Sequence, residues 1–363
     1  MILTTHLGKS IKVPYALRRL PSTLEVSLLP FAGDPQPGDI ALAHVERIGR
    51  NTAVELANGR RCTLQVGDPL AVVFGNRYAT KQFEGYARAA EDSCDLLSMG
   101  GLCGIATSKH ASVAEPSKLR LLHTIGDATQ EPLRLRNFAV PRTAQVRKPH
   151  VLVVCGTSMD SGKTYTAMSL IIGLRRQNCP VAGIKLTGTG AGRDTWTMRD
   201  AGACVALDFI DGGVASTFKH PLQELLKLHT LLVNYAAQQG AEWVIIEIAD
   251  GLLQPETALL LQSPLFTETV DAWVFAASEP LAAVGGMSLL KNWGITPLAI
   301  SGLLSMSPLE MRETEMATGV LCVTAAQLQS GELNPRLLET IGHVVHPQPA
   351  EHQLGDTAPA TNA

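Results

Sequence analysis

The sequence predicts an α/β fold, with a doubly wound, mostly parallel sheet in the second half of the chain and a smaller β-rich domain, barrel- or sandwich-like, before it. Three observations predict this fold. From Val151 onward, continuous apolar runs alternate with longer helical segments. Between Gly38 and Phe74, short runs alternate apolar with polar residues. A glycine-rich loop at residues 156–164 joins an apolar run to a helical pattern.

The second half predicts parallel strands because its apolar runs are uninterrupted, which is typical of strands covered on both faces. The segments between these runs have helical length and periodicity, so right-handed crossovers are expected. The predicted strands are residues 150–156, 180–186, 242–251, 272–278 and 297–305, and the predicted helices are residues 164–177, 222–240 and 281–294.

The first half predicts short strands within residues 39–48, 52–66 and 68–74. Asn58 and Gly59 stand in the middle of the second segment, and this pair favours a type I′ hairpin turn because both residues tolerate a positive φ. The close spacing of the runs indicates a small antiparallel barrel or sandwich.

These patterns divide the chain into three parts. We expect a β-rich domain at residues 1–145, an α/β domain at residues 146–345 and a flexible tail at residues 346–363. The tail has too little apolar surface to offset the cost of ordering it. The polar, proline-bearing stretch 131–150 is interpreted as a linker or a last edge strand.

Charge and composition limit the partners. A formal net charge of −3 and a pI near 6.4 give no general attraction to nucleic acid or to acidic membranes, so the expected partners are small molecules or proteins, with a small-molecule substrate foremost. No apolar stretch approaches the length of a membrane span, and no secretory signal is evident, which predicts a cytoplasmic protein. The 7 cysteines are scattered without metal spacing, and a homodimer is left open.

The loop at residues 156–164 is predicted to bind the phosphates of a nucleotide. Glycine lets successive backbone N–H groups point at phosphate oxygens, and the following helix adds the positive end of its dipole. Lys163 would reach the β- and γ-phosphates, and Thr164 would offer its hydroxyl to Mg²⁺. The predicted nucleotide-binding residues are Gly156, Thr157, Ser158, Met159, Asp160, Ser161, Gly162, Lys163, Thr164 and Tyr165.

This loop differs from the usual Walker A spacing, because five residues instead of four separate Gly156 from Gly162. In that spacing it resembles dethiobiotin synthetase and its relatives, a class of P-loop proteins that includes MinD-type ATPases and cobyrinate amidases. The resemblance covers residues 150–330 and extends to a second strand ending in Lys185 and a third ending in Glu247. It leaves the first 145 residues unexplained.

The resemblance implies roles for residues beyond the loop. Lys185 would meet the substrate and assist catalysis beside Lys163, and Glu247 would hold the metal. A further metal-binding acid is expected after the second strand, where Asp194 is favoured over Asp200 because the surrounding glycines describe a loop. Carboxylate oxygens at the carboxyl ends of strands suit Mg²⁺ and ligand binding in open α/β sheets.

The substrate-binding candidates are spread along the chain, and each has a plainer interpretation as a surface or capping residue. They are Lys185, Thr187, Arg193, Asp211 and Lys219 in the α/β domain, and Asn76, Arg77 and Tyr78 as a wall supplied by the β-rich domain. Ser216 or Thr217 is predicted to cap the following helix. The stripe from Leu303 to Met311 is predicted to be core.

Three functions are compatible with these residues. The first is an ATP- and Mg²⁺-dependent enzyme of the dethiobiotin synthetase type, which phosphorylates a small molecule or activates a carboxylate or carbamate. The second is a nucleotide-switched binding protein or chaperone with slow NTPase activity, and the third is a P-loop scaffold for other group transfer. The chain lacks the Asn-Lys and Thr-Lys-x-Asp patterns that select guanine, which favours ATP.

Ser158 stands where dethiobiotin synthetase carries an aspartate, and residues 247–251 replace its Glu-Gly-Ala-Gly-Gly turn. These departures argue against diaminopelargonate as the substrate. Thr157 occupies the position of the leading lysine in MinD-type ATPases, which argues against activation of that kind across a dimer interface.

Overall fold

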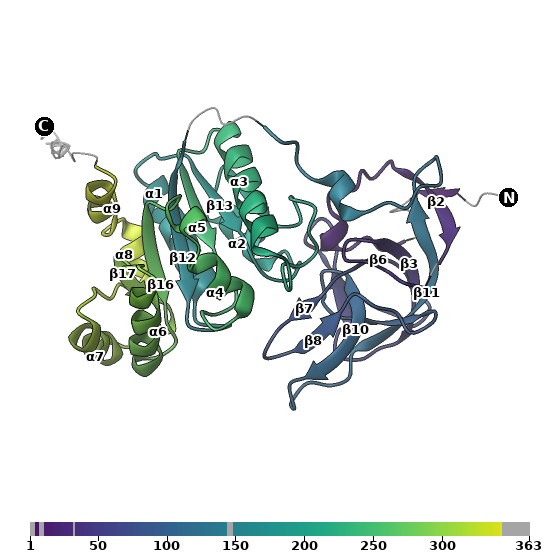
Figure 1. Ribbon diagram of the computed structural model, residues 1–363, viewed down its shortest axis with the longest axis horizontal. Helices are drawn as coiled ribbons and strands as arrows, with labels where there is room; N and C mark the ends of the chain where they lie inside the picture. The colour runs from purple at the N-terminus through teal and green to yellow at the C-terminus, as the bar shows by residue number, and fades with distance from the viewer. Residues whose placement is uncertain (1–3, 7–10, 32, 144–147, 343–363) are drawn as a thin grey trace, which may run out of the picture.

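The structure is a computed structural model that describes residues 4–6, 11–31, 33–143 and 148–342. It consists of a β-rich half and an α/β half that lie side by side (Figure 1). The predicted tail at residues 346–363 lies outside the described residues. Within the part that is described, no helix is both long and apolar enough to cross a membrane.

The β-rich half is built on one large sheet. Within the described residues its strands are β1 (Thr4–His6), β2 (Glu25–Pro30), β3 (Ile40–Arg47), β6 (Pro69–Phe74), β7 (Arg77–Tyr78), β8 (Phe83–Tyr86), β9 (Ser93–Leu96), β10 (Leu102–Lys109) and β11 (Ser117–Gly126). The short 3₁₀ helix η1 (Tyr15–Leu17) lies between β1 and β2, and a second one, η2 (Leu135–Phe138), follows β11.

Part of this sheet closes into a small barrel. The strands pair in the order β11, β3, β6, β10 and β9, and β9 pairs with β11 to complete the ring. Successive residues of a strand point to opposite faces of a sheet. In β3, Ala41, Ala43 and Val45 therefore share one face, where they pack with Phe74 in the interior of the barrel. The predicted barrel is therefore present, although β6 and β10 run parallel and the ring is not wholly antiparallel.

The predicted hairpin is present as β4 (Ala53–Glu55) and β5 (Arg61–Thr63). Its turn is not the predicted type I′. Gly59 has φ +84°, whereas Asn58 is not among the residues with positive φ. The Gly59 amide donates to the Leu56 carbonyl at 2.8 Å, so a tight turn is followed by a single left-handed glycine.

The α/β half has a parallel sheet, as predicted. Its strand order is β14-β13-β15-β12-β16-β17, with β12 (His150–Gly156), β13 (Val181–Lys185), β14 (Val205–Asp208), β15 (Trp243–Glu247), β16 (Ala272–Ala276) and β17 (Ala299–Ser301). The central strand β12 pairs in parallel with β15 on one side and β16 on the other. A loop that follows β12 therefore emerges at the switch point of the sheet, where open α/β sheets bind ligands.

Helices cover both faces of this sheet. They are α1 (Lys163–Arg175), α2 (Arg193–Asp200), α3 (Leu222–Gln238), α4 (Pro255–Leu261), α5 (Pro264–Thr267), α6 (Pro280–Asn292), α7 (Pro308–Thr318), α8 (Ala325–Ser330) and α9 (Asn334–Thr340), with the 3₁₀ helix η3 (Leu303–Met306). Leu152 and Val154 of β12 pack with α1, whereas Val151 and Val153 pack in the core that contains α3. The uninterrupted apolar run of β12 thus reflects two buried faces.

Two expectations about the α/β half were wrong. The strand that was expected to be third, ending in Glu247, is the fourth in the chain, because β14 precedes it. The stripe from Leu303 to Met311 is not core as a whole, since Met306 is 81% exposed and Leu309 is 62% exposed, and only Leu304 is fully buried.

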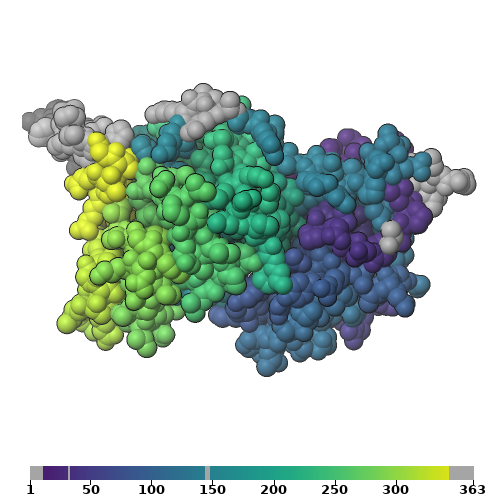
Figure 2. Space-filling view, viewed as in Figure 1, coloured from purple at the N-terminus to yellow at the C-terminus, as the bar shows by residue number. Residues whose placement is uncertain are grey.

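The two halves share one continuous apolar core and several buried polar contacts. Tyr15 and Leu17 of η1 belong to the same cluster as Phe209 and Ile210, which follow β14. Figure 2 shows the two halves in close contact over a broad surface. The paired Gly100 and Gly101 explain part of this closeness, because a Cβ on Gly100 would collide with the Gly190 carbonyl.

Candidate functional site

The glycine-rich loop lies between β12 and α1, and its two outer glycines are required by space. A Cβ on Gly156 would lie 2.5 Å from Ser161 Oγ, and one on Gly162 would lie 2.8 Å from Gly302 Cα. Gly162 also has φ +98°, a conformation that favours glycine, and it immediately precedes α1. The extra residue in the loop is accommodated by Asp160, which adopts φ +64°.

Lys163 turns its side chain back over the loop. Its Nζ donates to the Ser158 carbonyl at 2.7 Å and to the Asp250 carbonyl at 2.5 Å. Burial lowers the pKa of Lys163, while the Glu247 and Asp250 carboxylates oppose that shift. An ammonium held only by carbonyl oxygens can exchange them for phosphate oxygens at little cost.

Four of the predicted residues meet one another beside the loop. Thr164 Oγ1 lies 2.9 Å from Glu247 Oε1 and 3.1 Å from Asp194 Oδ1. The Lys185 ammonium forms an ion pair with Asp194 Oδ2. The register explains the meeting, because Lys185 and Glu247 end adjacent strands as direct partners. Asp194 was expected in a loop, but it lies in the first turn of α2.

The electrostatics of this cluster favour the arrival of a cation. Burial, and then the Asp194 carboxylate, raise the pKa of Glu247 to about 7. Lys185 and its hydrogen bond hold the pKa of Asp194 below its usual range despite burial. Burial also raises the pKa of Asp250. Crowded carboxyl groups that resist ionisation are stabilised as anions when a metal binds.

Several buried polar atoms at the loop have no partner among the described residues. They are Thr157 Oγ1, Ser161 Oγ and Glu247 Oε2. Buried hydroxyl and carboxyl oxygens in folded proteins are nearly always hydrogen-bonded. Their coincidence at one loop indicates that a polar ligand belongs here.

The oxygens of this cluster fit Mg²⁺. Thr164 Oγ1, Asp194 Oδ1 and Glu247 Oε1 are hard oxygen donors on one spot, and Glu247 Oε2 has no protein partner within the described part of the chain. Across the described residues, no three His, Cys, Asp or Glu side chains gather as a metal cage. The fit is therefore to an ion that also takes ligands from phosphate and water.

The β-rich half reaches this site through the β7–β8 hairpin. Lys81, in the turn of this hairpin, pairs with Asp160 of the glycine-rich loop at 2.8 Å. Arg77 is half-buried and its Nε has no partner among the described residues; burial lowers its pKa to about 10, while the charge of Asp250 opposes that shift. Tyr78 packs on Phe218 with ring centroids 5.3 Å apart. Arg77 and Tyr78 of the predicted wall thus lie at the α/β half, and their role toward a substrate stays a prediction.

A small recess between the halves extends the site. Tyr78, Thr217, Asp250 and Gln254 are among its lining residues, with the Gly188–Thr189 turn. Thr187 lies at its edge and donates to the Ala249 carbonyl at 2.5 Å. Asn76 lies behind this recess, because its Nδ2 donates to the carbonyl of the lining residue Phe218 at 3.5 Å and its Oδ1 accepts from the Ala87 amide at 3.0 Å.

Other predicted residues lie apart from this cluster. The Asp211 carboxylate is 2.5 Å from Arg18 Nη2 and so takes part in the interface between the halves. Arg193 is exposed at the start of α2. Tyr165 is 57% exposed. Neither Ser216 nor Thr217 caps α3, whose N-cap is Pro221, so that prediction was wrong.

Sequence reasoning gave Asp250 no role and gave Thr217 only a helix-capping role, but the structure brings both residues to the site. Asp250 lies in the turn after β15, and its position near a strand's carboxyl end could have singled it out. Thr217 holds the loop after β13, because its Oγ1 accepts from the Gly188 amide at 2.8 Å. No short-range sequence signal links those two residues.

The α/β half has the fold of P-loop domains. The sheet order, the loop after the central strand and the lysine and threonine that begin α1 carry this conclusion. No protein-family model and no curated protein matches the sequence.

Similar solved structures belong to the signal recognition particle system. The 54 kDa protein from Aeropyrum pernix K1 in complex with GDP is 18% identical with a TM-score of 0.36, over 55% of this chain and 48% of that one. The receptor FtsY from Elizabethkingia anophelis in complex with GDP is 15% identical with a TM-score of 0.36, over 54% of this chain and 63% of that one. The chain therefore spans about half to two thirds of the length of these proteins.

Proposed function

We propose that the protein is an ATP- and Mg²⁺-dependent enzyme that activates a carboxylate or carbamate of a small molecule by phosphorylation, as dethiobiotin synthetase does. The cluster of Lys163, Thr164, Lys185, Asp194 and Glu247 around unpaired polar atoms of the loop is the observation that carries this proposal. At one edge of the sheet, this cluster brings together a lysine placed to bind phosphate, three oxygen donors placed to bind a metal ion, and a second lysine.

The residues of the chain divide the work. Thr164, Asp194 and Glu247 would hold Mg²⁺, which when bound neutralises charge on the β- and γ-phosphates. Lys163 would release its two carbonyl acceptors and bind the same phosphates. Lys185 would give up part of its ion pair with Asp194 and stabilise the charge on the transferred group.

The proposed reaction has two steps. A carboxylate oxygen of the substrate attacks the γ-phosphorus, the bond to the β,γ-bridging oxygen breaks, and ADP leaves. An amine nitrogen then attacks the acyl carbon, an amide bond forms, and inorganic phosphate leaves. Positioning and charge neutralisation supply most of the rate enhancement for such phosphoryl transfers.

The recess beside Asp250 is the proposed substrate site. The buried Arg77 guanidinium with its unpaired Nε suits a substrate carboxylate, because arginine binds carboxylates through paired N–H groups. The raised pKa of Asp250 suits a group that takes a proton from an attacking amine. Both halves of the chain would thus contribute to substrate recognition.

ATP is part of the proposal because no guanine-selecting pattern occurs in the sequence. The two similar solved structures with GDP show the nucleotide of those proteins and do not bear on the nucleotide of this chain.

A second candidate function has its own supporting observation. Large apolar side chains lie exposed on α6, η3 and α7, with Leu281 78% exposed and Met316 89% exposed. Such a surface suits a nucleotide-switched binding protein, or a homodimer, that covers it with a partner.

Phosphate release from Mg²⁺–ATP by the whole chain tests the proposal. We expect slow release alone and faster release with the right carboxylate and amine from a small-molecule panel. Lys163→Ala should abolish turnover and leave the melting temperature of the ligand-free protein nearly unchanged, because its ammonium bonds only to loop carbonyls. Lys291→Ala, which alters an exposed lysine of α6, is the matched control.

The outcomes separate the candidates. Undiminished turnover in Lys163→Ala would refute both the ATP-dependent enzyme and the nucleotide-switched binding protein. Release that responds to an added protein and to no small molecule would favour the switched binding protein.

A further inference from the structure

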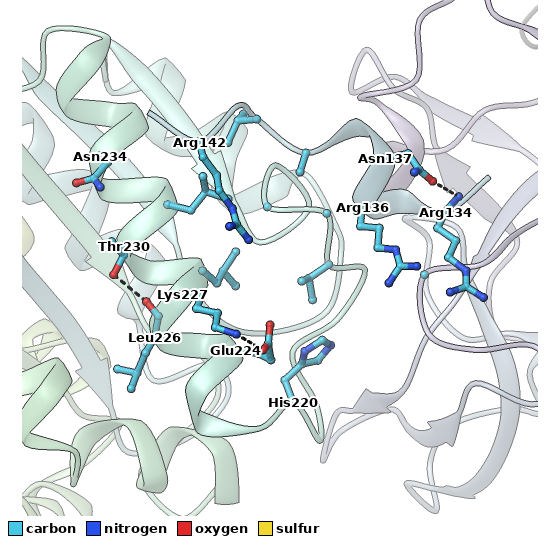
Figure 3. Close-up of a pocket in the computed structure, with 18 of the residues that line it drawn as sticks. Arg134, Arg136, Asn137, Arg142, His220, Glu224, Leu226, Lys227, Thr230 and Asn234 are labelled. Carbon is cyan, nitrogen blue, oxygen red and sulfur yellow. Dashed lines mark hydrogen bonds and ion pairs between the residues drawn. The ribbon is translucent and has the colours of Figure 1, made fainter. Parts of the chain in front are cut away.

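A second cavity, of about 1210 Å³, lies between the two halves of the chain. Residues of η2 and of the segment after it form one wall, and α3 with the turn at residues 212–214 forms the other. Figure 3 shows Arg136 and Arg142 extending into this space opposite Lys227 and His220. None of the residues proposed for ATP, Mg²⁺ or the substrate lines it, so it is separate from the site described above.

The lining of this cavity is strongly basic. Arg134, Arg136, Arg142 and Lys227 contribute positive charge, and Glu224 is the one carboxylate among the described lining residues. Arg134 pairs with Asp39 at 2.8 Å, and Lys227 pairs with Glu224 at 2.8 Å.

Two of these cations, the exposed Arg136 and Arg142, have no ion-pair partner. Among the described residues, none forms an ion pair with either guanidinium or accepts a hydrogen bond from it, and Arg142 shares the Glu224 carboxylate only at longer range, since Lys227 and then Arg142 lower the pKa of Glu224. The whole chain carries a net charge of −3, so this local excess of positive charge runs against the overall balance.

Further donors and an apolar wall complete the cavity. The side of α3 between Glu224 and Asn234 lines this space. The buried Thr143 Oγ1 has no partner among the described residues. Burial lowers the pKa of His220, which keeps its imidazole neutral near pH 7. Leu226 and Leu231 supply apolar surface.

We propose that this cavity binds a small organic anion that carries two or more carboxylate or phosphate groups. Guanidinium groups bind such groups through paired, charge-assisted hydrogen bonds. Arg136 comes from the β-rich half, Arg142 from the connection and Lys227 from α3, so the ligand bridges the two halves. The apolar wall favours an organic anion over a bare inorganic one.

Isothermal titration of the whole chain with citrate, and separately with 2,3-bisphosphoglycerate, tests this proposal at fixed ionic strength without divalent metal. We expect saturable binding of at least one probe. The double variant Arg136→Gln/Arg142→Gln should weaken it by at least roughly tenfold, because two charge-assisted contacts are lost. Single variants Arg136→Gln and Lys227→Gln should each weaken it measurably, because the ligand contacts both halves.

The matched control removes two other exposed arginines, one from each half, as Arg47→Gln/Arg176→Gln. Its affinity should stay within roughly twofold of the wild type, since equal charge is removed away from the cavity. Tighter binding of citrate identifies carboxylates as the preferred groups, and tighter binding of 2,3-bisphosphoglycerate identifies phosphates. Absence of saturable binding, or equal binding by the Arg136→Gln/Arg142→Gln and control proteins, would overturn the proposal.

Discussion

Glu247 shows how one residue links stability to ligand binding. Glu247 is 2% exposed, and its carboxyl group contacts the same Thr164 hydroxyl as the Asp194 carboxyl group. Burial and the nearby Asp194 carboxylate raise the pKa of Glu247 to about 7. The ordinary pKa of a glutamate side chain is 4.5. Between pH 4.5 and pH 7, Glu247 is therefore protonated in the folded state and ionised in the unfolded state. Stability therefore falls as pH rises from about 4.5 toward 7, and Glu247 is destabilising above 7.

Replacement of Glu247 by Gln should remove this pH dependence. We expect the unfolding free energy of Glu247→Gln, relative to the wild type, to rise by about 2–3 kcal/mol between pH 5 and pH 8. Urea unfolding across this range measures it. Asp250 also has a raised pKa and is present in both proteins, so its contribution cancels in the difference. A constant difference would show that Glu247 does not titrate in this range.

The same titration should appear in ligand binding. Mg²⁺ and a nucleotide would require the ionised carboxylate, so binding releases a proton and tightens as pH rises through 7. We expect the dissociation constant of Mg²⁺–ATP to fall from pH 6 to pH 8 in the wild type and to be flat in Glu247→Gln. Titration calorimetry in buffers of different ionisation enthalpy measures the released proton directly, and equal slopes in both proteins would contradict this assignment.

Among the elements, α6 contains two adjacent glycines with opposite surroundings. Gly285 is exposed, and a Cβ there would meet no atom within 4 Å. A Cβ on Gly286 would lie 2.8 Å from Phe275 Cε1 and closer still to Cζ of the same ring. Phe275 belongs to β16, whose Ala276 carbonyl accepts from the Thr157 amide at 3.0 Å. Packing at Gly286 thus supports the phosphate-binding loop.

The two alanine variants should differ in sign. Gly285→Ala should stabilise the protein by about 0.5–1 kcal/mol, because alanine loses less backbone entropy in a helix. Gly286→Ala should destabilise it by about 1–3 kcal/mol through overpacking, and should also weaken nucleotide binding. Each is the control for the other in urea unfolding. Equal effects would show that the helix can shift away from β16.

The elements differed in how far the sequence could predict them. The long apolar runs of β12, β15 and β16 and the periodic α1 and α3 were found, because burial on two faces or on one stripe leaves a strong pattern. The short α2 was expected to be a loop, because Gly188, Gly190 and Gly192 precede it and its polar residues have no apolar stripe. What holds it is tertiary, since the Trp196 indole donates to Glu55 at 2.7 Å.

At the site, too, the residues set by a local sequence pattern could be predicted, whereas those set by tertiary contacts could not. Lys163 and Thr164 are fixed by their place in a loop motif, and Lys185 and Glu247 by their place at strand ends. The placement of Arg77 within reach of the charge of Asp250 depends on how the two sheets meet. Local sequence carries no information on such a meeting, so the residues that line the recess proposed for the substrate could not be predicted from it.

In the whole molecule, a buried ionic network joins the halves behind the site. Arg18 Nη2 lies 2.9 Å from Asp208 Oδ1 and 2.5 Å from Asp211 Oδ2, and Tyr15 donates to Asp208 at 2.8 Å. Tyr15 also shares a hydrogen bond of 2.5 Å with Thr195, the neighbour of Asp194. The β-rich half therefore fixes the helix that carries a proposed metal ligand.

Removal of Arg18 should loosen this network. Arg18→Met leaves Asp208 and Asp211 buried without their cation, and a loss of about 3–5 kcal/mol at pH 8 is expected. The loss should be smaller at pH 5, because burial already raises the pKa of Asp211 and a proton can replace the cation. Chemical unfolding at both pH values measures it.

The control for this prediction is Arg120→Met. That arginine is 61% exposed and pairs with a half-exposed Asp92 at 3.1 Å, so its loss should cost less than about 1 kcal/mol. Arg18→Met/Asp211→Asn should recover part of the lost stability. Equal losses in Arg18→Met and Arg120→Met would show that the network does not hold the halves together.

The close approach of Gly100 to Gly190 joins a part of the chain that is synthesised early to a part that is synthesised later. Ribosomes release the β-rich half first, and domains generally fold in that sequence as they emerge. Its surface around Tyr15, Glu55 and Gly100 is therefore already shaped when residues 188–196 appear, and it can serve as a template on which they settle. A nascent chain would bring the proposed metal-binding residues together only after this docking.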